Sequence, residues 1–202
     1  MGIRKILTVL SAVALVTSIA GMASLSSTSS SVEFAPSAHA AAVDYFLKIE
    51  GVEGESTDDR HKGEIQIESF SWGASQPGIG QMGSGGGGGA GKVSVHDISI
   101  TKSVDKASPV LMVSSATGVH FPRAVLTVRK SGDNNQAEYF KVTLSDVLIS
   151  SYQVGGDQGS LPADTFSLNF SKIEFEYLPQ NPDGSLGAPV KAGYDVKANK
   201  KV

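Results

Sequence analysis

The sequence predicts a mainly β protein, in which bent strands form a barrel and one short helix packs on it. Apolar and polar residues alternate over most of the chain after residue 40, which is the pattern of half-buried strands. In several segments the alternation slips by one residue, and such a slip indicates a bulge that bends a sheet toward closure. One segment, 106–118, instead carries the signals of a helix.

The first expected strands lie on both sides of a glycine-rich segment. They cover 45–50, 64–72 and 93–100, and the second and third each contain one change of phase. Phe70 and Trp72 lie near the end of the second strand. We interpret both as core residues, with a contact at a rim as the alternative.

Between these strands, residues 78–91 hold nine glycines in fourteen positions. Such a segment loses much conformational entropy when it orders and buries nothing, so we expect a mobile loop. The run GGGGAGK at 86–92 also matches the pattern of a phosphate-binding loop. However, Val93 stands where that loop needs Ser or Thr, and a strand follows where a helix is needed, so we do not expect nucleotide binding.

The helix is predicted from its two ends. Ser108 is expected as the N-cap, Pro109 as the first helical residue and Gly118 as the stop. The side chains expected to face the barrel are Val110, Leu111 and Ser114.

Two long strands, 120–130 and 138–156, dominate the second half of the chain, and the turn 131–135 joins them. A further strand is expected at 166–177. The second and third of these strands each contain one change of phase, which predicts a bulge in each. The remaining segments are a turn at 179–187 and a last strand at 190–197.

The N-terminus has the pattern of a secretory signal peptide. Arg4 and Lys5 precede an apolar run over 6–20, which is short for a membrane span. Ala38 and Ala40 supply the small residues that a signal peptidase reads, so we expect cleavage after Ala40, a signal peptide at 1–40 and a domain at 41–202. An earlier cut near residue 23 and an uncleaved anchor are the alternatives.

Charge and residue types exclude several classes of function. The net charge of −3 gives no electrostatic basis for binding nucleic acid or anionic lipid. The chain has no cysteine, so it has neither disulfides nor a thiolate metal site. No H-x-x-x-H or H-x-x-x-x-H pair and no G-x-S-x-G motif occurs, so we expect no metal, no cofactor and no enzymatic activity.

The remaining charged residues have no pattern of a site. The acidic segment 50–59 lacks the alternate spacing of a calcium loop and is expected to be solvated. Four further residues are likewise interpreted as solvated charges of the sheet: Lys48, Glu64, Lys102 and Arg129.

Several motifs, in order along the chain, resemble those of one family. They include DYFLKIEGVEGES at 44–56, SFSWG at 69–73, HFPRAVLTVRK at 120–130 and EYFKVTLSDVLISSYQVGG at 138–156. On these motifs the chain is identified as a member of the Hcp family, the hemolysin-coregulated proteins. The resemblance covers about residues 43–200. It implies a two-sheet β-barrel with one flanking helix, which forms hexameric rings that stack into the tube of a type VI secretion system.

The resemblance also implies where the functional surfaces lie. Ser69 and Ser71 are candidates to face the channel, where effector proteins are carried. The candidates for ring contact or stacking are the loop residues Gly78, Gly85, Gly89 and Gly91. The expected partners are further copies of the chain, effector proteins and a spike protein, with no stable membrane insertion after cleavage.

One feature departs from the family, whose members start in the cytoplasm without a cleavable signal. We expect a secreted protein, and an exported paralogue of the tube subunit is the favoured explanation. A misassigned start codon is another. Two other functions remain open. A secreted binding module would be a monomer with an exposed aromatic platform, and a secreted hydrolase is disfavoured by the missing motifs.

Overall fold

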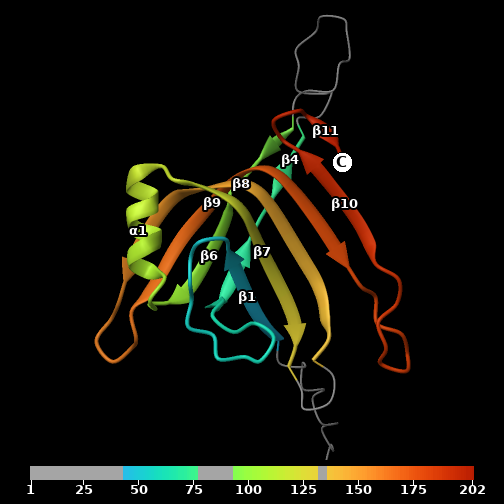
Figure 1. Cartoon of the computed structure of the whole chain (residues 1–202), viewed down its shortest axis with the longest axis horizontal. Coiled ribbons are helices and arrows are strands. Elements are labelled where there is room, and N and C mark those ends of the chain that lie inside the picture. The colour runs from blue at the N-terminus through green and yellow to red at the C-terminus, as the bar shows by residue number, and fades with distance from the viewer. Residues whose placement is uncertain (1–42, 77–92, 132–135) are drawn as a thin grey trace, which may run out of the picture. The chain divides into compact units, whose positions relative to one another are not determined.

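The computed structural model describes residues 43–76, 93–131 and 136–202, which belong to the compact unit His39–Val202 (Figure 1). The expected signal peptide with Ala38 and Ala40, the loop residues Gly78, Gly85, Gly89 and Gly91, and most of the turn 131–135 lie outside these residues. The elements are β1 (Val43–Ile49), β2 (Ile65–Ile67), β3 (Ser69–Ser71), β4 (Ala74–Ser75), β5 (Ser94–Val95), β6 (Ile98–Ser103), α1 (Ser108–Thr117), β7 (His120–Lys130), β8 (Glu138–Gly155), β9 (Ala163–Tyr177), β10 (Val190–Asp195) and β11 (Lys200–Lys201).

Nine strands form one hydrogen-bonded network, which divides into two sheets that share β8 and β9, while β4 and β5 pair separately as a two-stranded sheet. One sheet has the order β11–β10–β9–β8–β7–β1–β2, and the other has the order β3–β6–β9–β8. Strand β9 divides between them, because residues 163–168 pair with β6 and residues 172–177 pair with β10. The barrel closes where the chain passes from β2, paired with β1, into β3, paired with β6. The predicted two-sheet barrel with one short helix is confirmed, and Figure 1 shows α1 on one flank of it.

The predicted changes of phase are present, but they take a different form from bulges. Buried residues occur three apart in three neighbouring strands, in the pairs Phe121 and Ala124, Leu144 and Val147, and Phe170 and Ile173. The register between β8 and β9 is nevertheless the same before and after Asp146. The alternation of buried and outward residues shifts by one position in all three strands at the same height of the sheet. The pairing between the strands is therefore kept, and the sheet bends as a unit. The register shifts lie elsewhere, between Val128 and Arg129 and between Ile149 and Ser151.

The interior of the barrel is filled by aliphatic and aromatic side chains from the strands. Leu47, Ile65, Ile100 and Leu168 are at most 1% exposed. The core interpretation of Phe70 and Trp72 is confirmed. Both are partly buried against this core, and their rings contact Tyr45 and Phe175, respectively.

The helix agrees with the prediction at its end and differs at its start. Gly118 has a φ of 68° and its N–H donates to the carbonyl of Ser114, as expected of a stop. Ala107, rather than Ser108, is the N-cap, and Ser108 is the first helical residue, with its hydroxyl engaged in a polar cluster between α1 and the barrel. Val110 was expected to face the barrel and is instead 43% exposed, while Leu111 and Ser114 are buried.

Among the described residues, no helix combines the length and the apolar character that crossing a membrane requires.

Candidate functional site

One face of the β3–β6–β9–β8 sheet is lined by small hydroxyl side chains. The opposite face carries the buried residues Ile98, Ile100, Phe166 and Leu168, so alternate positions point outward. Cross-strand pairing places outward residues in two rows, Ser69–Thr101–Thr165–Gln153 and Ser71–Ser99–Ser167–Ser151. Ser69 and Ser71 therefore belong to a continuous polar surface, and both are exposed. We call this surface the hydroxyl face.

Both ends of this four-stranded sheet are open. In the part of the chain that the structure describes, β3 pairs only with β6. At the other end, β8 pairs with β7 only as far as Leu148, so among the described residues the segment 150–155 has only β9 as a paired strand. An open strand edge presents unpaired N–H and C=O groups, which are suited to pairing with another chain.

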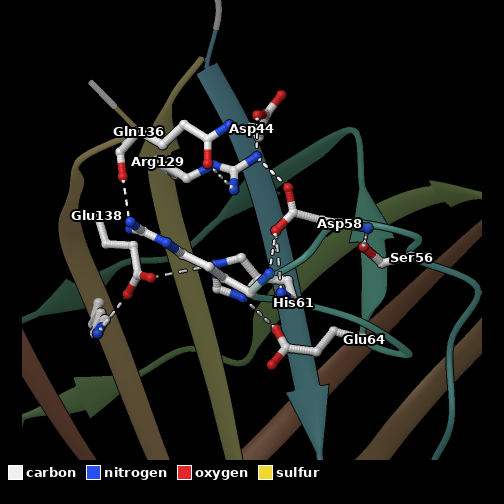
Figure 2. A network of polar contacts seen from close by, with 10 residues as sticks. Asp44, Ser56, Asp58, His61, Glu64, Arg129, Gln136 and Glu138 are labelled. Atoms are coloured by element: carbon white, nitrogen blue, oxygen red, sulfur yellow. Dashed lines mark hydrogen bonds and ion pairs between the residues drawn. The ribbon is translucent and has the colours of Figure 1, made fainter. Parts of the chain in front are cut away.

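A second polar arrangement fixes the loop 52–64 on the outer side of the other sheet (Figure 2). The Arg129 guanidinium donates to Asp44 at 2.9 Å and forms an ion pair with Asp58 at 2.7 Å. Its Cζ lies 4.9 Å from the centre of the Phe46 ring. The prediction that Arg129 is a solvated strand charge is wrong, because the loop covers it to 4% exposure.

His61 lies beside this ion pair. Its ring stacks on Phe46 with 4.1 Å between centroids, and its Nδ1 is 2.8 Å from Glu64. Its Nε2 lies 3.6 Å from Glu138 (Figure 2). Glu64, expected to be solvated, is half-buried in this contact, whereas Lys48 is exposed as expected.

Asp58 corrects the interpretation of the whole segment 50–59 as solvated. The side-chain hydrogen bond from Arg129 lowers the pKa of Asp58 from 3.8 to about 2, against an opposing effect of burial, and the N–H groups of Arg60 and His61 add to the lowering. Glu53 and Asp59 do remain exposed. Asp58 thus joins the loop to β7 through Arg129.

We expect Asp58 to make the stability of the protein depend on pH in the acid range. A carboxyl group whose pKa is lower in the folded state stabilises the fold above its unfolded pKa, and this contribution is lost as pH falls through the folded value. The contribution of Asp58 should therefore disappear between about pH 4 and pH 2. Urea unfolding midpoints at several pH values should fall less steeply over this interval in Asp58→Asn than in the wild type. Asp59→Asn, an exposed neighbour, should keep the wild-type slope, and equal slopes in all three proteins would contradict the prediction.

A third polar cluster lies between α1 and the barrel. Lys102 Nζ is 2.9 Å from Asp164, 2.7 Å from Asp105 and 2.8 Å from the Ser108 hydroxyl. Tyr152 donates to the second oxygen of Asp164 at 2.9 Å. The prediction that Lys102 is a solvated charge is wrong, because Lys102 and Asp164 are both 0% exposed.

The ionisation of this cluster follows from its partners. Burial raises the pKa of Asp164, but hydrogen bonds from Ser108, Lys102 and Tyr152 outweigh it and lower the pKa overall. Burial, followed by the neighbouring Asp164, raises the pKa of Tyr152 to about 12. A serine beside a lysine is also an arrangement found in hydrolases, but here neither Lys102 nor Asp164 has any surface that a substrate could reach. The cluster therefore joins the start of α1 to β6 and β9.

The structure places the histidines apart. His61 is buried, His96 lies after β5, and His120 is 2.7 Å from Asp146 at the surface. Within the described residues, no three His, Asp or Glu side chains converge as the ligands of a metal ion would.

Comparisons with known proteins agree on one family. Residues 46–177 match the family model described as "Type VI secretion system effector, Hcp". The chain is similar to protein hcp1 of Pseudomonas aeruginosa, with 48% identity over 160 residues that cover 78% of this chain and 98% of that protein. Its fold is similar to the crystal structure of Hcp1 from Salmonella typhimurium, with a TM-score of 0.64, 36% identity and coverage of 80% and 99% of the two chains. It is also similar to a solved type six secretion system protein, with a TM-score of 0.73, 30% identity and coverage of 80% and 100%.

Proposed function

The chain belongs to the Hcp family, and from this premise we propose that it is a structural tube subunit of a type VI secretion apparatus. It assembles into stacked hexameric rings whose channel carries effector proteins. The observation that supports this function most directly is the hydroxyl face on a sheet with two open edges, in a chain that aligns with nearly the whole length of its relatives. Hcp proteins are secreted by the type VI secretion system.

The ring is built by strand edges. A ring of identical subunits uses two different surfaces of each chain, and six copies close when each is rotated by about 60° from the last. We propose that the edge of β3 in one copy meets residues 150–155 of β8 in the next. The hydroxyl faces, including Ser69 and Ser71, then line the channel.

Helix α1 supplies an apolar surface to the same contact. It contains no charged residue, and Val110, Met112 and Val113 are exposed on it. A surface helix normally has a polar outer face, so this apolar face is suited to burial against a neighbour. The helix packs on β8, the strand that carries one of the two open edges.

The mass of the purified protein tests the assembly. Light scattering and electron microscopy of the chain from residue 41 onward should give a ring of six times the single-chain mass over a wide range of concentration. A protein that remains single under all these conditions would overturn the tube function. It would instead support the secreted binding module.

The N-terminal segment is proposed as a signal peptide that is cleaved after Ala40. A chain exported in this way would form its ring outside the cytoplasm, as a paralogue of the tube subunit, because it could not join an apparatus that assembles in the cytoplasm. N-terminal sequencing of the protein from culture fluid and from the periplasm tests this point. Recovery of an intact Met1 from both fractions would contradict export with cleavage.

The glycine segment is proposed as a stacking contact, through residues such as Gly78, Gly85, Gly89 and Gly91. Deleting 85–89 should leave the barrel folded, because these five glycines have no side chains to place in a core. Stacks of rings should shorten in electron micrographs while single rings persist. Loss of the β signal in circular dichroism would show that the segment is needed for folding.

A further inference from the structure

The hydroxyl face carries two carboxylates whose charge is not neutralised by the described part of the chain. Glu68 lies at one end of the face, where its Oε1 accepts a hydrogen bond from the Ser103 hydroxyl at 2.6 Å. Asp97 lies at the other end, where Asn169 Nδ2 donates to it at 2.8 Å and the Ser150 hydroxyl also donates to it. All three donors are neutral, so none of these contacts pairs either carboxylate with a positive charge.

The neighbouring sheet shows the contrasting arrangement. There the strand carboxylates are paired with lysines, as Glu138–Lys141 at 2.7 Å, Glu174–Lys172 at 3.2 Å and Glu176–Lys191. Within the described residues, no lysine, arginine or histidine forms an ion pair with Glu68 or Asp97. On the neighbouring sheet, lysines therefore neutralise the strand carboxylates. On the hydroxyl face, two carboxylates have no positively charged partner among the described residues.

The hydrogen bonds also fix where these charges lie. Asp97 is held by groups on β8 and β9, and Glu68 is held by β6, so neither carboxylate is free to turn away from the face. Asp97 and Ser103 are six residues apart along one extended segment, which corresponds to about 20 Å. The two charges are thus separated along the strand direction rather than gathered in one cluster.

We propose that the hydroxyl face binds cationic segments of transported proteins through Glu68 and Asp97. This inference rests on the proposed function, because six copies around a channel turn the two positions into two belts of six carboxylates. A narrow channel with charge of one sign concentrates ligands of the opposite sign. A ligand that carries several arginine or lysine side chains contacts several carboxylates of one belt at once, which multiplies a weak single contact.

Binding of a charged probe peptide tests the proposal. The full-length chain is titrated into a fluorescein-labelled peptide of alternating arginine and serine, and fluorescence anisotropy gives the affinity. The same sequence with glutamate in place of arginine is the control peptide. We expect binding of the arginine peptide only, with affinity that falls as salt is raised. The double variant Glu68→Gln, Asp97→Asn should bind it roughly tenfold more weakly, and each single variant should lie between.

A control variant and the mass of the ring separate a failure of peptide binding from a failure of ring formation. Asp59→Asn removes an exposed carboxylate from the loop 52–64, away from the hydroxyl face, and should bind like the wild type. Light scattering on every variant reports ring formation separately. Rings of the double variant that bind the arginine peptide as tightly as the wild type would overturn the proposal and leave the tube function intact. Wild-type rings that bind neither peptide, or both equally, would overturn it as well. A wild-type protein that forms no rings would instead remove the tube function, and the carboxylate belts with it.

Discussion

Replacing Leu144 by Asp is expected to abolish folding. Leu144 is 1% exposed in the middle of β8, and its cross-strand neighbours are Ala124 on β7 and Ile173 on β9. Truncation of a core leucine to alanine alone costs about 2–5 kcal/mol, and burial of an unpaired carboxylate adds to this cost. A domain of this size is stable by only about 5–15 kcal/mol. Circular dichroism should therefore show no native β signal, and urea should produce no cooperative transition.

Two variants separate this effect from a general sensitivity of β8. Leu144→Met keeps the volume and the apolar character, so it should cost less than about 1.5 kcal/mol. Gln153→Asp introduces the same carboxylate into the same strand at an exposed position, and it should stay folded. A soluble Leu144→Asp protein that still forms rings would mean that the interior of the barrel is elsewhere.

The strands and the helix could be predicted because their signals are local. Alternation of apolar residues is visible along each strand, and Gly118 ends the helix through its own conformation. The aligned bend at Asp146 was visible only as separate changes of phase. The shifts in alternation lie side by side in β7, β8 and β9 because of the register between these strands. The sequence of a single strand does not contain that register.

The two buried cations show different limits of sequence reasoning. Lys102 follows Ile98 and Ile100 at the same period of two, so the pattern already placed it inside the barrel. The position of Lys102 in the strand outweighs the usual preference of a lysine side chain for solvent. Arg129 had no such signal. It is on the outer side of its sheet and is buried only because the loop 52–64 covers it, a contact between segments far apart in the sequence.

Sequence placed Ser69 and Ser71 correctly on the face opposite Phe70, but it could not show how far the polar surface extends. That extent is set by the pairing of β3 with β6 and of β6 with β9. The partners of Glu68 and Asp97 depend on the same pairing, since Asn169 and Ser150 belong to strands that follow much later in the chain. A surface formed by residues from several strands can be identified only when the register between those strands is known.

Replacing Lys102 by Met is expected to cost about 3–5 kcal/mol of stability, the usual effect of removing one partner of a buried ion pair. The methionine itself fits an apolar site, so the cost arises from the groups left behind. Asp164 is 0% exposed and would keep only the donors Ser108 and Tyr152. Asp105 would lose its contact with the ammonium at 2.7 Å. Urea unfolding at pH 7 measures the effect, and Lys48→Met, at an exposed position of β1, should change stability by less than about 0.5 kcal/mol.

A double-mutant cycle with Asp164→Asn tests whether the loss comes from this pair. In a protein that already carries Asp164→Asn, no negative charge remains at that position for Lys102 to neutralise, so Lys102→Met should cost less than it does in the wild type. The difference is the coupling energy, which for residues in one network is about 0.5–3 kcal/mol. The two substitutions should therefore be less damaging together than the sum of each alone. Additive costs would mean that Lys102 stabilises the start of α1 through Ser108 and Asp105 alone, and that Asp164 is held by Tyr152 without it.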